Sequence, residues 1–97
     1  MLILTPLMPD ESLLRDKARA AIRNGHLTTR KQDLLLGASG SGKPCAVCSE
    51  PIPREQAELE VVFNQAGIAP GLEIYHFHPR CFAAWEFERT KVDGTSH

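Results

Sequence analysis

The sequence predicts a small α+β domain that is stabilised by a structural metal ion and preceded by an amphipathic helix. First, every cysteine in the chain belongs to one of two closely spaced ligand pairs, Cys45–Cys48 and His78–Cys81, with 29 residues between the pairs. Second, two segments between these pairs alternate in the manner of β-strands. Third, a chain of 97 residues forms only a small hydrophobic core, so a bound metal ion would add stability that the core alone does not supply.

The spacing of the two pairs indicates a single tetrahedral zinc site with Cys45, Cys48, His78 and Cys81 as ligands. Four protein ligands leave no open coordination position, so we expect one structural Zn²⁺ per chain rather than a catalytic ion. A set of disulfides does not account for these residues, because three cysteines cannot all pair. A redox Cys-x2-Cys is typical of a strand–helix–strand context, whereas this pair lies in a turn-rich segment between Pro44 and Pro51.

His76 is a rival metal ligand, because it lies two residues before His78. We prefer His78, since its spacing to Cys81 repeats the spacing within the first pair. His76 falls inside a predicted strand, where we expect it to support the site or to hydrogen-bond a ligand. If both imidazoles faced the metal, one cysteine would be displaced and an open site would form.

The composition favours a cytoplasmic protein. No apolar run reaches the roughly 20 residues that a membrane span needs, so we predict no membrane insertion. The first eight residues, MLILTPLM, are apolar, but they are too short for a secretory signal and lack a charged start. Free cysteines at metal-ligand spacing fit a reducing compartment.

The segment 1–31 is predicted to contain an amphipathic helix from about residue 11 to residue 24. Asp10 is a candidate N-cap, and Gly25 is well placed to end the helix in a left-handed conformation. Apolar residues recur at helical spacing between these two points: Leu14, Ala18, Ala21 and Ile22. This apolar stripe must be buried, either on the metal module or on a second copy of the chain.

The segment 32–44 is predicted to be a Gly/Ser-rich linker. Its run Gly37-Ala-Ser-Gly-Ser-Gly-Lys43 also matches part of a phosphate-binding loop. We reject nucleotide binding, because Pro44 occupies the position of the Ser or Thr that meets magnesium, and no predicted helix follows to offer its N-terminal amides.

The module 45–91 is predicted to continue with a β-hairpin. Residues 58–63 and 72–77 form the two strands, joined by a turn-rich loop at 64–71. The pattern puts Leu59, Val61 and Phe63 on one side of the first strand with Glu58 and Glu60 on the other, and it places Leu72 and Ile74 together on the second strand.

A C-terminal helix is predicted from Pro79 to about Thr90, because proline is favoured at the first helical position. Within it, Phe82 and Trp85 are expected to pack on the hairpin. Three charged residues are expected on its outer surface, and a flexible tail is expected at 92–97. The three are Glu86, Glu88 and Arg89.

The order of a Cys-x2-Cys turn, a hairpin and a helix that opens with His-x2-Cys resembles a treble-clef zinc finger. The ligand order and long spacer resemble the poly(ADP-ribose) polymerase-type finger, in which a phenylalanine follows the last ligand as Phe82 follows Cys81 here. The resemblance covers residues 45 to about 89 and implies the treble-clef fold. Members of that class recognise DNA ends, but Trp85 is displaced from the family's tryptophan position and no matching basic set is present.

Charge is unevenly distributed along the chain. Residues 1–31 carry a net charge of +3 and residues 32–97 carry −4, so the metal-bearing part lacks the basic surface that nucleic-acid binding requires. We therefore predict a non-enzymatic protein-interaction or regulatory module, with a protein partner or self-association through the N-terminal helix and Leu34–Leu36.

The alternative is a nucleic-acid-binding finger that uses the basic N-terminal segment. Its candidate contacts, to phosphate or to a partner, are Arg15, Arg19, Arg23, Arg30 and Lys31. A zinc or thiol enzyme is the third hypothesis. It would need a ligand replaced by water and a nearby general base, for which only His76 or Glu50 are candidates.

Overall fold

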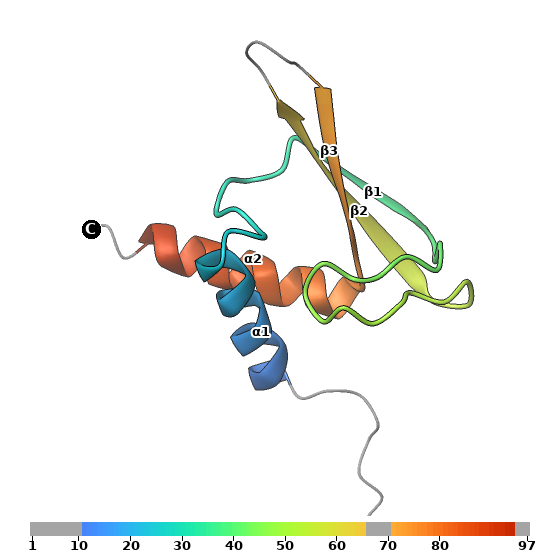
Figure 1. Cartoon of the computed structure of the whole chain (residues 1–97), viewed down its shortest axis with the longest axis horizontal. Helices are drawn as coiled ribbons and strands as arrows, with labels where there is room; N and C mark the ends of the chain where they lie inside the picture. Colours follow the sequence, from blue (N-terminus) through green and yellow to red (C-terminus); the bar gives the residue numbers. More distant parts are fainter. Residues whose placement is uncertain (1–10, 66–70, 95–97) are drawn as a thin grey trace, which may run out of the picture.

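The computed structural model of the protein describes residues 11–65 and 71–94 (Figure 1). These residues form two helices and a three-stranded antiparallel sheet, so the predicted α+β class is confirmed. Neither helix is long and apolar enough to cross a membrane. The elements are α1 (Glu11–Arg23), β1 (Leu34–Ser39), β2 (Ala57–Gln65), β3 (Gly71–Phe77) and α2 (Pro79–Gly94).

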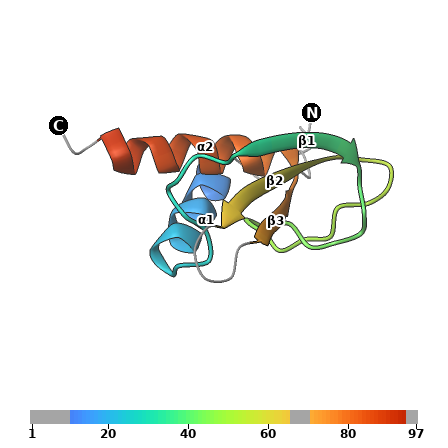
Figure 2. The ribbon, with the colours of Figure 1, turned by 90° about the horizontal axis from the view of Figure 1, so that it is seen from above.

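Helix α1 forms at the predicted position and buries the predicted stripe. Leu14, Ala18 and Ala21 are all buried, because α1 packs across α2 (Figure 2). The helix ends before Gly25, whose φ of 81° is the left-handed conformation expected of a C-terminal glycine. The predicted N-cap, Asp10, lies outside the described residues.

Helix α2 begins at Pro79 as predicted but extends to Gly94, so it includes three residues of the predicted tail. The prediction that Glu88 and Arg89 lie on its outer surface is wrong, because both are buried. Arg19 of α1 donates to the Glu88 carboxylate at 3.1 Å, and the Arg89 guanidinium lies 5.5 Å from the centre of the Trp85 ring. The ion pair with α1 therefore accounts for the burial of Glu88, while Arg89 contacts Glu86 and Trp85 of its own helix.

The sheet contains the predicted hairpin and one strand that the sequence did not predict. β2 and β3 pair antiparallel, with Leu59 opposite Phe77. β1 lies within the segment predicted as a linker and pairs antiparallel with β2 in a continuous register from Leu34–Val62 to Ser39–Ala57. β2 is therefore the central strand, and β1 and β3 are the two edges.

The inner face of the sheet packs against α2, and its centre is Trp85. This side chain is completely buried, and its ring centre lies 5.6 Å from that of Phe77 and 6.3 Å from that of Phe63. Its indole N–H donates to the Thr28 carbonyl at 2.9 Å, so it also holds the segment after α1. The predicted core role of Trp85 is confirmed.

The outer face of the sheet is not covered by any described helix. Opposed residues of an antiparallel sheet point to the same side, and the register aligns Leu34, Val62 and Ile74 in one row and Leu36, Glu60 and His76 in the next. The aliphatic residues at the two edges of this face are exposed. They are Leu34, Leu36, Leu72 and Ile74.

Candidate metal centre

The first ligand pair lies in a tight turn, which we call the knuckle (residues 44–51). Its two ends are paired as an isolated bridge between Pro44 and Pro51. Within it, the Ser49 N–H donates to the Cys45 carbonyl at 2.9 Å, and Ser49 adopts a left-handed φ of 70°. The Val47 N–H donates to the Cys45 sulfur at 3.4 Å, a contact that favours a negatively charged sulfur.

The second ligand pair lies where β3 leads into α2. Pro79 starts the helix, so His78 immediately precedes it and Cys81 lies in its first turn. The Phe82 N–H donates to the His78 carbonyl at 2.9 Å and fixes the backbone between the two ligands. Both side chains consequently face the knuckle.

The four predicted ligands meet at one point. One ligand atom from each of Cys45, Cys48, His78 and Cys81 lies within 4.8 Å of all the others. The His78 Nδ1 atom is 3.5 Å from the Cys48 sulfur and 3.9 Å from the Cys81 sulfur. Sulfur and nitrogen atoms around a tetrahedral zinc lie at such separations, so the arrangement is compatible with one metal ion.

The electrostatics of the three thiols also fit a cation. A hydrogen bond from the Cys81 side chain lowers the pKa of Cys45 to about 4. The same hydrogen bond, together with burial, raises the pKa of Cys81, while burial raises the pKa of Cys48. Like charges this close oppose one another, so the cluster alone favours one thiolate. A bound divalent cation would allow all three sulfurs to ionise.

His76 does not belong to the cysteine cluster. Its Nδ1 atom contacts the carboxylate of Glu58, and the Glu60 carboxylate lies 3.9 Å away. The backbone of His76 is nevertheless tied to the metal centre, because its carbonyl accepts a hydrogen bond of 2.8 Å from the Ala46 N–H. His76 thus supports the knuckle through its backbone, while its side chain belongs to a separate polar group on the outer face.

Glu58 lies on the predicted face of β2, but its burial was not predicted. It points to the outer face, as alternation predicts, but it is buried, because the segment after β1 folds over it. The Ser41 N–H and hydroxyl both donate to its Oε1 atom at 2.8 Å. Burial opposes ionisation of Glu58, but the hydrogen bonds from His76 and Ser41 outweigh it and lower its pKa. No sequence signal marked Ser41 as its partner.

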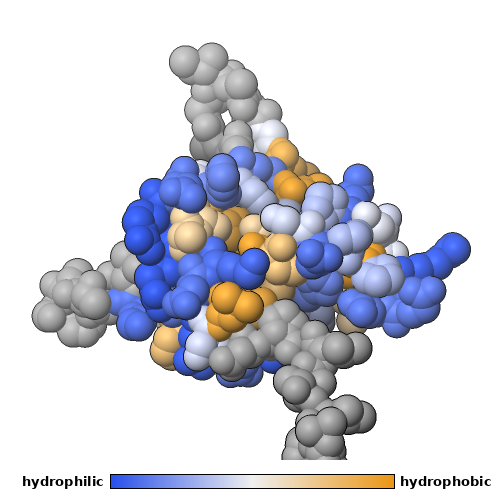
Figure 3. Space-filling model, turned by 60° about the horizontal axis from the view of Figure 1, so that its bottom comes forward, coloured by the Kyte–Doolittle hydropathy of each residue, from blue (hydrophilic) through white to orange (hydrophobic). Residues whose placement is uncertain are grey.

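The predicted basic contacts do not form a single free cationic surface. Figure 3, in which the α1 end comes forward, shows a predominantly hydrophilic surface with smaller hydrophobic areas between. Arg23 and Lys31 are exposed, whereas the other three arginines form ion pairs. The pairs are Arg15 with Glu11, Arg19 with Asp16 and Glu88, and Arg30 with Asp33.

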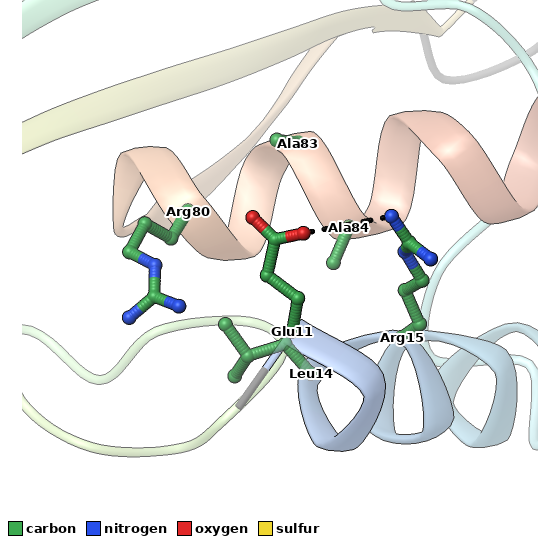
Figure 4. A pocket seen from close by; sticks show the side chains of 6 residues that line it. All are labelled: Glu11, Leu14, Arg15, Arg80, Ala83 and Ala84. Atoms are coloured by element: carbon green, nitrogen blue, oxygen red, sulfur yellow. Dashed lines mark ion pairs between the residues drawn. The ribbon is translucent and has the colours of Figure 1, made fainter. Parts of the chain in front are cut away.

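A small pocket lies between the two helices (Figure 4). Its one carboxylate, Glu11, already pairs with Arg15 at 3.5 Å. None of the four cluster ligands lines the pocket, and its lining offers no thiol or imidazole, so we assign it no catalytic role. The lining residues are Glu11, Leu14, Arg15, Arg80, Ala83 and Ala84.

Comparison with known proteins identifies no relative from which a function could be transferred. No protein-family model matches the chain, and no curated protein or solved structure is significantly similar to it. The candidate site therefore rests on the geometry of its own residues.

Proposed function

We propose that the chain is a non-enzymatic protein-interaction module whose fold is maintained by one structural zinc ion. The observation that carries this proposal is the convergence of three cysteines and one histidine on one point, with all three cysteines of the chain among them. Thiolate and imidazole donors suit zinc, and a set of four protein ligands closes its coordination shell. The metal then stabilises the fold and performs no chemistry.

The treble-clef arrangement is part of this proposal. Its support is the order of a knuckle carrying Cys45 and Cys48, the β2–β3 hairpin, and helix α2 with Cys81 in its first turn. In such a fold the metal joins the knuckle to the start of the helix, so the hairpin between them is held at both ends. The sheet then becomes a rigid platform.

The interaction role is supported by the outer face of that platform. Leu72 is 65% exposed, and Leu34, Leu36 and Ile74 are 44–51% exposed. Grouped exposed aliphatic side chains on one sheet face are typical of protein-binding surfaces rather than of an isolated small domain. The nucleic-acid alternative has weaker support, because ion pairs occupy Arg15, Arg19 and Arg30.

The metal part of the proposal is tested by measuring zinc in protein purified without added metal, together with circular dichroism before and after a strong chelator. We expect one zinc per chain and loss of structure on chelation. Metal-free protein that stays folded would refute the structural zinc site. The binding part is tested with a DNA duplex at rising salt, where steeply salt-dependent binding would favour the nucleic-acid alternative.

A further inference from the structure

In the part of the chain that the structure describes, strand β1 has a pairing partner on one side only and forms an edge of the sheet. Among the described elements β1 contacts only β2, and all six of its residues are exposed. Alternate N–H and C=O groups of an antiparallel edge strand point away from its neighbour and remain free to pair. Proteins usually protect such edges with charged residues, prolines or bulges. The sequence of β1, LLLGAS, has no charge or proline, and its register with β2 is unbroken.

The opposite edge, β3, is protected in two ways. The Ala46 N–H already donates to the His76 carbonyl, so the knuckle occupies part of this edge. β3 also carries a charged residue, Glu73, near its exposed end. If two copies paired through β3, the knuckle and the Glu73 carboxylate of each copy would lie at the junction. Strand β1 has neither obstacle, so it is the edge suited to pairing.

We infer that the partner of β1 is the β1 strand of a second copy, paired antiparallel about a two-fold axis at Leu36. This inference rests on the proposed protein-interaction function and names its partner. In this register Leu35 lies opposite Gly37 of the second copy, and Leu34 lies opposite Ala38 of the second copy. Each large side chain away from the axis meets a small one, and no like charges are opposed.

The two-fold arrangement closes on itself, because each copy uses the same edge once. It joins two three-stranded sheets into one six-stranded sheet whose outer faces lie on the same side. The exposed Leu34 and Leu36 of each copy then lie near those of the other. Pairing removes the open edge from solvent and so removes a site of uncontrolled strand addition.

The test is sedimentation equilibrium of the zinc-loaded full chain over a range of concentrations, with the wild type compared with Leu36→Lys. The substitution places two ammonium groups opposite each other at the axis, so we expect dimerisation to weaken at least about tenfold. Leu36 is 44% exposed in the monomer, so the variant should fold. Zinc content and circular dichroism verify that the variant folds. Leu35→Lys is a second variant, and because its charge lies opposite Gly37 of the second copy rather than opposite itself, it should weaken the dimer less than Leu36→Lys does.

The matched control is Leu13→Lys, which puts the same charge on a leucine of α1 that is 47% exposed and lies away from the sheet. It should leave the dimer intact. A wild type that stays monomeric would overturn the β1 pairing, as would a dimer that survives Leu36→Lys or that Leu13→Lys dissociates. A monomer that still binds zinc and unfolds on chelation leaves the proposed metal role standing, so the two proposals fail separately.

Discussion

The two faces of the sheet differ in how completely the chain covers them. On the inner face Val61, Phe77 and Trp85 are fully buried between the strands and α2. On the outer face Leu36 of β1 and Leu72 of β3 are exposed, although Leu72 belongs to the same strand as Phe77. The difference teaches that the buried core lies on the inner face, while the aliphatic side chains at the edges of the outer face stay exposed. Substitutions should then separate into strong effects on one side and weak effects on the other.

The largest effect is expected at the metal centre. Cys81→Ser should abolish stable folding, because structural zinc supplies roughly 10–16 kcal/mol of apparent binding energy in small zinc-finger peptides, while domains are stable by only about 5–15 kcal/mol. Circular dichroism and zinc content measure the loss. His76→Ala is the control, since His76 lies outside the cysteine cluster, and it should keep the metal. A variant with His76→Ala that loses zinc would overturn the ligand assignment.

The next effect is expected in the inner core. Trp85→Ala should lower the free energy of unfolding by about 3–5 kcal/mol, because it removes a fully buried indole and leaves a cavity. Denaturant unfolding of the zinc-loaded protein measures this. The matched control is Phe87→Ala on the same helix, where the side chain is 45% exposed and the loss should be much smaller. Equal losses at the two positions would contradict the packing described here.

A smaller effect is expected at Glu58. Glu58→Ala should lower the free energy of unfolding by about 1–3 kcal/mol, because it removes the hydrogen bonds that this buried carboxylate accepts. The partners affected are Ser41 and His76. Glu60→Ala changes a side chain that is 31% exposed, so it should lower the free energy of unfolding by a smaller amount. The ranking is measured by denaturant unfolding at neutral pH.

The Glu58 contribution also depends on pH. Since folding lowers the pKa of Glu58 below its ordinary value of 4.5, its stabilisation is fully present above that value and is lost as the pH falls through the lowered pKa. The stability difference between wild type and Glu58→Ala should therefore narrow as the pH falls toward and below 4.5. If the stability difference between wild type and Glu58→Ala instead widened at low pH, the pKa of Glu58 would not be lowered by folding.

The smallest effect is expected on the outer face. Leu72→Ser should change the free energy of unfolding by no more than about 0.5 kcal/mol, because the side chain is 65% exposed. Thermal unfolding of wild type and variant in parallel measures this. A large loss of stability would mean that Leu72 belongs to the core, and the two faces would no longer differ in the way proposed.

The local pattern predicted the elements whose signals are contained within a few residues. The helical spacing from Leu14 to Ala21 predicted α1, and the position of Pro79 predicted the start of α2. Alternation predicted the strands of the hairpin. The paired spacing of cysteines and histidine predicted which residues come together, because ligands three positions apart in a turn or in a first helical turn share one direction.

The sequence could not predict features that depend on distant partners. β1 was missed because Gly37 and Ser39 resemble linker residues, and only pairing with β2 makes the segment a strand. Glu88 was placed at the surface because its burial depends on Arg19, which lies 69 residues away. Alternation placed Glu58 on the correct face of β2 but could not predict its burial, because its partner Ser41 lies in the predicted linker. In each case a tertiary contact overrode the local pattern.

The position of Trp85 allows loading of the proposed zinc site to be followed by optical spectroscopy. It is the single tryptophan of the chain, it packs against Phe77 of β3, and it bonds to Thr28 beyond α1. Its fluorescence emission therefore comes from the junction of both helices with the sheet. Adding zinc to the metal-free chain should shift that emission to shorter wavelength as the indole leaves water, so one intrinsic chromophore can follow the rate at which the metal organises the fold.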